Sequence, residues 1–180
     1  MYFEKRGAEN TAETVRLALE TAGERGIRNI VVASSSGETA LLFANDAGVA
    51  VTCVTYAYGF AEDGKGSLDD AVREQLNQKS IAVLATTHVL SGVERGISSE
   101  FGGMYPAEIL SNALRMFGHG VKVCVEVSIM ALDAGLVPHG EKIIAVGGSG
   151  KGADTAVILT PAHAKKVFNT KVHEIICKPV

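Results

Sequence analysis

Apolar residues along the chain recur with two different spacings, and together these spacings predict strands that alternate with helices. Continuously apolar runs rich in Val and Ile are typical of strands that a parallel sheet buries on both faces. Such runs occupy residues 29–34, 50–56, 80–87, 141–148, 155–162 and 172–180. Segments with apolar residues three or four positions apart lie between most of these runs, and this alternation predicts a layered α/β domain.

Capping residues, in addition to the apolar periodicity, predict where the helices begin and end. Asn10 and Glu13 form a capping-box pattern before a helix over residues 11–25, which a glycine then ends. Ser67 and Asp70 form a similar pattern before another helix. The other predicted helices, including the one that follows Ser67, cover residues 37–47, 68–78, 106–118 and 121–135.

The connections between the predicted strands indicate how the sheet is arranged. The turn between residues 148 and 155 is too short for a crossover helix, so the two strands that it joins are expected to be antiparallel neighbours. Residues 88–104 are dense in Gly and Ser and are predicted to form a long loop. We therefore expect one domain over residues 1–180, an α/β/α sandwich whose mostly parallel sheet has an antiparallel edge strand.

Charge and composition narrow the classes of partner. The net charge of −3 and the lack of a Lys/Arg run argue against nucleic acid and against a polybasic membrane contact. No apolar segment approaches the ~20 residues that span a bilayer, and the charged N-terminal segment lacks the apolar core of a signal peptide. The 3 dispersed cysteines are typical of reduced thiols, so we expect a cytoplasmic protein.

The titratable residues form no metal or nucleophile motif. Glu126 and Asp133 are seven positions apart on a predicted helix and are expected on its polar surface. Neither a G-x-S-x-G elbow nor a cysteine with a placed histidine occurs. We predict no metal site, because no spacing brings two histidines together on one helix face among His119, His139, His163 and His173.

The turn after the first predicted strand is unusually rich in hydroxyl groups. One hydroxyl suffices to cap a helix, yet four hydroxyl residues, a glycine and an acid occur here: Ser34, Ser35, Ser36, Gly37, Glu38 and Thr39. A helix N-terminus also binds anions, so the turn is predicted to hold a phosphate, with an elaborate cap as the alternative. On this hypothesis Gly37→Asp would block the anion and leave the fold intact.

Further candidate residues lie in loops that a parallel sheet brings to the same edge, at the carboxyl ends of its strands. His88 follows the third predicted strand and is a candidate for proton transfer, although a hydrogen-bonded loop histidine explains it equally well. Glu94 and Arg95 form either a solvated pair or, through Arg95, a phosphate contact. The segment GGSGKGAD matches neither a dinucleotide fingerprint nor a P-loop, which leaves a glycine turn that a ligand can approach or a plain tight turn.

Three segments resemble the C-terminal α/β domain of pyruvate kinase. They are NIVVASSSGETALLFANDAGVAVTCVT, DAGLVPHGEKIIAVGGSG and VHEIICKPV, whereas residues 87–108 depart from that family. The whole chain is similar to small stand-alone proteins of this type. The resemblance implies a strand order of 3-2-1-4-5, a homo-oligomer and, in the stand-alone proteins, bound FMN. A pyruvate kinase catalytic barrel is too large for 180 residues.

Carried over by resemblance, the phosphate role falls on the turn from Ser35 to Thr39. The flat ring system would then lie against Thr86, Thr87, His88, Gly147, Gly148, Ser149 and Gly150. These residues suggest a flavin-dependent oxidoreductase as the first functional hypothesis. The alternatives are a non-catalytic sensor or carrier of a phosphorylated metabolite, and a hydrolase or transferase with His88 as the acid or base.

Overall fold

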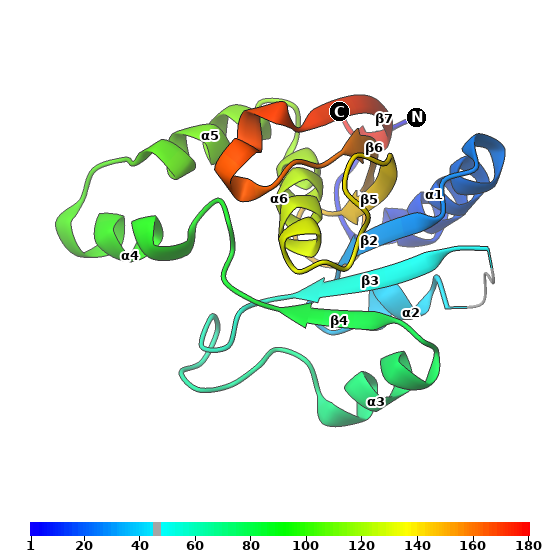
Figure 1. Cartoon of the computed structure of the whole chain (residues 1–180), viewed down its shortest axis with the longest axis horizontal. Coiled ribbons are helices and arrows are strands. Elements are labelled where there is room, and N and C mark those ends of the chain that lie inside the picture. The colour runs from blue at the N-terminus through cyan, green and yellow to red at the C-terminus, as the bar shows by residue number, and fades with distance from the viewer. Residues whose placement is uncertain (45–47) are drawn as a thin grey trace.

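A computed structural model describes residues 1–44 and 48–180, which form one seven-stranded sheet with helices on both faces (Figure 1). The strands are β1 Tyr2–Phe3, β2 Asn29–Ala33, β3 Ala50–Thr55, β4 Ala82–Ala85, β5 Ile143–Gly147, β6 Thr155–Thr160 and β7 Lys171–Pro179. The α-helices are α1 Thr11–Arg25, α2 Glu38–Leu41, α3 Asp70–Gln78, α4 Gly92–Phe101, α5 Pro106–Arg115 and α6 His119–Asp133. Two short 3-10 helices cover Ala8–Asn10 and Ala164–Asn169.

The sheet has the order β1-β7-β6-β5-β2-β3-β4, which confirms the predicted mostly parallel α/β arrangement. The first five predicted strands are β2 to β6, and they lie in the predicted order of 3-2-1-4-5. Strand β6 pairs antiparallel with β5, as the short turn between them required. In detail the sheet continues beyond β6, because β7 pairs antiparallel with β6 and the short β1 pairs parallel with β7.

Side chains alternate between the two faces of the strands, and this alternation divides the core in two. Ile30 and Val32 belong to the cluster under α1, α2 and α3, whereas Val31 faces α6. The same alternation holds in β5, where Ile144 and Ile143 lie on opposite faces. Each central strand is therefore buried on both sides, which is why its sequence is continuously apolar.

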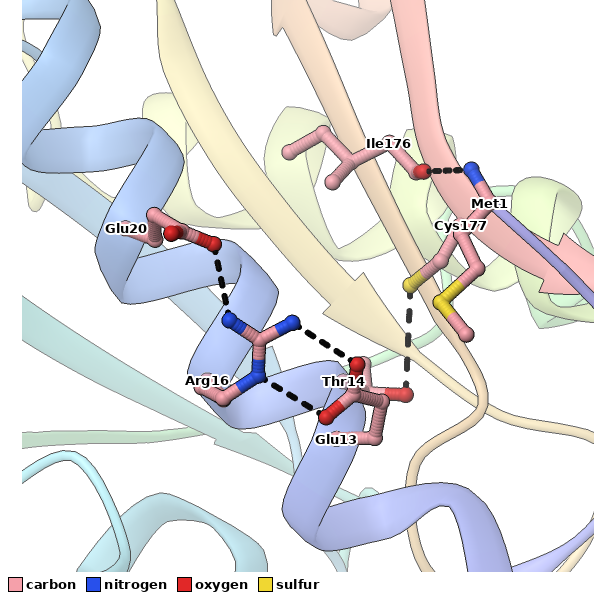
Figure 2. A network of polar contacts seen from close by, with 7 residues as sticks. All are labelled: Met1, Glu13, Thr14, Arg16, Glu20, Ile176 and Cys177. Carbon is pink, nitrogen blue, oxygen red and sulfur yellow. Dashed lines mark hydrogen bonds and ion pairs between the residues drawn. The ribbon is translucent and has the colours of Figure 1, made fainter.

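Strand β7 holds the N-terminal segment and also contacts α1 (Figure 2). The Met1 amino group donates to the Ile176 carbonyl at 2.6 Å, and the Cys177 thiol lies 3.9 Å from the Thr14 hydroxyl of α1. On the outer surface of α1, Arg16 bonds to Glu13 and Glu20, both at 2.8–2.9 Å. The first strand is thus held by β7 although it is only two residues long.

The predicted bounds of α1 are confirmed, but its predicted capping box is wrong. The Asn10 side chain donates to the Lys5 carbonyl instead of capping the helix, and Glu13 is engaged by Arg16. The glycine that ends the helix, Gly26, has the left-handed φ of 64° expected there. The sequence therefore predicted the residue at which this helix ends, but it did not predict the hydrogen bonds made at its start.

The caps and length of the next two helices also differ from the prediction. Asp69 caps α3, because its carboxylate accepts from the Ala71 amide at 2.8 Å. The predicted cap by Ser67 is therefore wrong. The Ser67 hydroxyl is buried and has no hydrogen-bond partner. Helix α2 ends at Leu41. Beyond it, the amides of Phe43 and Ala44 donate to carbonyls three residues earlier in the chain, as in a 3-10 turn, instead of four. The remainder of the predicted helix over residues 45–47 lies outside the described residues.

Residues 88–104, predicted to be a loop, contain α4. Side chains of α4 bond to the first turn of α5: Glu94 accepts from the Ala107 amide at 2.7 Å, and the Ser98 hydroxyl donates to the Glu108 carboxylate at 2.7 Å. No residue of α4 is buried, and α4 and α5 extend away from the sheet (Figure 1). Val93 and Phe101 are each 77% exposed on this arm, and the expected homo-oligomer stays a prediction.

Among the described residues, no helix combines the length and apolar character needed to cross a bilayer.

Burial on α6 gives a direct test of the packing. Ile129 is fully buried in α6, whereas Ile109 on α5 is 54% exposed. We expect Ile129→Ala to lower the free energy of unfolding by about 2–5 kcal/mol, because it leaves a cavity. Ile109→Ala is the matched control and should change it by less than about 0.5 kcal/mol. Chemical denaturation measures both; equal effects would contradict the placement of α6.

Candidate functional site

Four loops meet at one edge of the sheet because β2, β3, β4 and β5 are mutually parallel. Strand order reverses between β2 and β5, where Val32 pairs with Val146. The turn after β2 and the glycine-rich loop after β5 are therefore neighbours at the point where parallel sheets commonly bind ligands. The loops after β3 and β4 follow along the same edge.

The hydroxyl-rich turn after β2 presents free backbone donors. Within the described residues, the amides of Ser35, Ser36, Glu38 and Thr39 donate to no acceptor, whereas Gly37 donates to Ser34 at 3.4 Å. The side chain of Ser36 is exposed and that of Ser35 is half-buried. Consecutive free amides beside hydroxyl groups can bind an oxyanion. Ser34 and Thr39 are both only 7% exposed, so they contribute mainly to the support of the turn.

Gly37 has a structural role that the sequence did not indicate. Its φ is 80°, and a Cβ atom there would lie 2.6 Å from Val72 Cγ1 and 2.9 Å from Leu68 Cδ1. The glycine is required because α3 packs against it. The expectation that Gly37→Asp leaves the fold intact is therefore wrong, because the new side chain would displace α3 before it reached an anion.

An aromatic cluster lies at the ends of β3 and β4. The ring centroids of Tyr56 and Phe60 are 4.5 Å apart, and His88 lies edge-on to Phe60 at 4.8 Å. Tyr56 is 38% and Phe60 43% exposed, so both rings can contact a ligand. Thr86 and Thr87, between β4 and His88, are exposed beside the cluster.

The sequence analysis missed this cluster because the low aromatic content gave no hint that the rings gather. A signal was nevertheless present. Tyr56 and Thr86 each directly follow one of two adjacent parallel strands whose last residues, Thr55 and Ala85, pair in register. The register therefore brings the residues that follow the two strands, including His88, close together.

The environment of His88 favours a neutral imidazole. Burial lowers the pKa of His88, the cations of Lys122 and Arg95 lower it further, and Glu126 opposes them. Arg95 itself lies over the Phe60 ring with its guanidinium carbon 5.6 Å from the ring centroid. A neutral ring can donate from one nitrogen and accept at the other, which suits it to hold a ligand atom or a proton.

A buried ion pair supports the loop that carries His88. Lys122 and Glu126 pair on α6 with 6% and 5% of their surfaces exposed, and Glu126 also accepts from the Leu90 amide at 3.0 Å. The prediction that Glu126 lies on a polar surface is wrong for this reason. Asp133 is exposed as expected, and it pairs with His163 at 2.6 Å.

The glycine-rich loop after β5 is fixed by its own packing. A Cβ atom at Gly147 would lie 3.0 Å from the Gly120 carbonyl of α6, and one at Gly148 would overlap the Gly152 carbonyl. These glycines are therefore needed by the fold itself, whether or not a ligand approaches. Gly150 has no neighbour within 4 Å of such an atom and is open to solvent.

Asp154 anchors this loop and was not singled out by the sequence analysis. Its carboxylate has 0% exposure and accepts from the Gly7 amide at 3.0 Å, the Ser149 amide at 3.2 Å and the Thr155 hydroxyl at 2.8 Å. Three segments thus share one buried carboxylate. An acid that directly follows a glycine-rich turn and precedes a buried strand was the signal available in the sequence.

The predicted residues do not all line one hollow. A cavity of about 580 Å³ lies farther along the same edge, beyond β5. Ser149 is the residue of the predicted site that lines this cavity. Neither the Ser35–Ser36 turn nor the aromatic cluster lines this cavity. Within residues 1–44 and 48–180, no three His, Cys, Asp or Glu side chains are grouped as a metal site requires.

The comparison with known families agrees with the geometry. The family model described as "Pyruvate kinase, alpha/beta domain" matches residues 12–159. The match includes the turn after β2, the loops after β3 and β4, and the glycine-rich loop after β5. The segments that form β1 and β7 lie outside it.

Asp154 yields a prediction about the stability of the carboxyl edge. Asp154→Asn replaces one acceptor oxygen by an NH₂ group that faces N–H donors, so we expect a loss of about 1–3 kcal/mol in unfolding free energy. Hydrogen exchange at the Gly7 and Ser149 amides should accelerate more than exchange elsewhere. Asp63→Asn, in an exposed loop, is the control. Unchanged exchange at both amides would show that the carboxylate does not hold them.

The environment of His88 yields a pH prediction. We expect its NMR titration midpoint below the ordinary value of about 6.5. Because the unfolded chain then takes up the proton first, the ring's contribution to stability is complete above pH ~6.5 and is lost as pH falls toward the folded pKa. His88→Gln should remove that part of the pH dependence in thermal unfolding. A midpoint at or above the ordinary value would refute the assignment.

Proposed function

The chain belongs to the family of the pyruvate kinase alpha/beta domain, and from its site we propose that it binds a phosphorylated small molecule with a flat ring system, FMN, at the carboxyl edge of the sheet. The observation that carries the proposal is the placement of free amides and hydroxyl groups after β2 beside accessible aromatic rings after β3 and β4. The two features suit the two ends of such a ligand.

The phosphate is assigned to the turn after β2. Ser35 and Ser36 offer free amides and hydroxyl groups, and Glu38 and Thr39 offer two further free amides. Backbone donors of this kind bind phosphate without a lysine or arginine in the turn itself. The Glu38 side chain is exposed, so its carboxylate can point to solvent while its amide donates.

The ring system is assigned to the aromatic cluster. Tyr56 and Phe60 offer exposed ring surface for stacking, and His88 stands edge-on to both rings, at 82° and 87°. The Arg95 guanidinium carbon lies 5.6 Å from the centroid of the Phe60 ring. The residues present therefore fit both a phosphate and a planar ring.

FMN, when bound, supplies hydride or single-electron transfer. The chain's own contribution is positioning: the turn binds the phosphate, the rings orient the flat system, and His88 holds or accepts a proton at a ring nitrogen. The buried Lys122–Glu126 pair keeps the loop of His88 in place through the Leu90 amide. We propose the flavin-dependent oxidoreductase as the activity to test, with a non-catalytic sensor or carrier as the alternative.

The binding proposal is tested by titrating the protein with FMN and with riboflavin, followed by flavin fluorescence. Ser36→Glu adds a negative charge at the phosphate position, so we expect it to weaken FMN binding about tenfold or more and to leave riboflavin binding unchanged. Phe60→Ala should weaken both ligands. Ser99→Glu, on the exposed surface of α4, is the matched control and should change neither.

Equal affinities for FMN and riboflavin in the wild-type protein would overturn the phosphate assignment. Failure of both to bind would overturn the flavin proposal. Once binding is established, the absorbance of bound flavin after addition of NADH or NADPH separates the two functions, because an oxidoreductase should bleach and recover in air, whereas a sensor should not.

A further inference from the structure

The cavity of about 580 Å³ lies at the same edge of the sheet as the proposed FMN site but over different strands. Strands β7 and β1 run parallel to β5, so their carboxyl ends reach this edge on the far side of the glycine-rich loop. Figure 1 shows the two chain ends there, near the connection from α5 to α6. Its lining includes Lys5, Arg6, Arg115, His119, Ser149 and Lys178.

Cationic side chains dominate this lining, although the protein as a whole has a net charge of −3. Within residues 1–44 and 48–180, none of the four cations forms an ion pair with a carboxylate: Lys5, Arg6, Arg115 and Lys178. Arg115 bonds only to the neutral groups of Ser111 and Asn112, at 2.8 and 3.0 Å. Among the side chains that line the cavity, Glu4 is the acidic one, so the cavity is positive in balance.

The start of α6 adds to this positive character. Helix α6 is 15 residues long, and the amides of His119 and Gly120 at its first turn donate to no acceptor in the described part of the chain. The positive end of the helix dipole therefore adjoins the four cations. Burial lowers the pKa of His119 and the Arg115 cation lowers it further, as expected for a ring in a positive environment.

We propose that this cavity is a second ligand site, for a small molecule that carries two or more phosphate charges. Its volume is that of a metabolite site, and guanidinium and ammonium groups without a carboxylate partner, beside free helix amides, are the donors that phosphate groups require. Six of the eleven lining residues lie outside the span that the family model matches. The proposed site does not depend on FMN binding.

One buried carboxylate connects the cavity to the loop after β5. Ser149 lines the cavity, and its amide donates to the same Asp154 carboxylate as the amide of Gly7, which follows Lys5 and Arg6. A ligand that binds Lys5 and Arg6 therefore restrains the segment that Asp154 joins to the loop after β5. Occupancy of the cavity is expected to slow hydrogen exchange at the Ser149 and Gly7 amides.

Calorimetric titration with pyrophosphate tests the proposal, with inorganic phosphate and citrate as comparison anions. We expect pyrophosphate to bind at least tenfold more tightly than inorganic phosphate, and Arg115→Gln and Lys178→Gln each to weaken it about tenfold. Lys79→Gln and Lys165→Gln each remove an exposed positive charge elsewhere and are the matched controls. Ser36→Glu should leave pyrophosphate binding intact, which separates this site from the FMN site.

Three results would overturn the proposal. The first is no pyrophosphate binding to the folded wild-type protein. The second is a loss in the Lys79→Gln and Lys165→Gln controls as large as in the cavity variants, since that indicates general attraction by surface charge. The third is citrate binding more tightly than pyrophosphate through Arg115 and Lys178, which would make the ligand a polycarboxylate.

Discussion

The carboxyl edge of this protein depends on the buried carboxylate of Asp154. A buried charge is tolerated only where hydrogen bonds replace its hydration, and Asp154 obtains them from the N-terminal segment, the loop after β5 and the start of β6. Helix α1 reinforces the arrangement, because Thr11 accepts from the Ala153 amide at 3.0 Å. The glycine-rich loop is therefore a fixed frame, with the proposed FMN site on one side and the cationic cavity on the other.

Periodicity predicted most of the fold because the dominant constraint is burial of a parallel sheet on both faces. Six apolar runs became β2 to β7, and the short turn before Thr155 predicted the antiparallel pair. Helix α4 could not be predicted, because its Gly and Ser residues are poor helix formers and its Glu94 and Ser98 side chains find their hydrogen-bond partners in α5. Strand β1 was missed because its two residues are held by β7.

The sequence predicted which loops form the candidate site, but it did not predict which residues contact each other there. The parallel topology indicated which loops meet at the edge of the sheet. The direction in which each residue of a loop points depends on the elements that pack against that loop. Gly37 faces α3 and Gly148 faces Gly152, so both serve the fold. The aromatic cluster follows from the register of β3 and β4, and the burial of Glu126 follows from the loop that bonds to it. None of these pairings has a local sequence signal.

We propose that the turn after β2 binds a phosphate while the rings of Tyr56 and Phe60 face the flat part of the same ligand. A crystal structure of the protein with FMN would show whether one ligand makes both contacts. We expect its phosphate within hydrogen-bond distance of the Ser35 and Ser36 amides and its ring system against Tyr56 and Phe60. A phosphate bound instead among Arg115 and Lys178 would overturn this proposal.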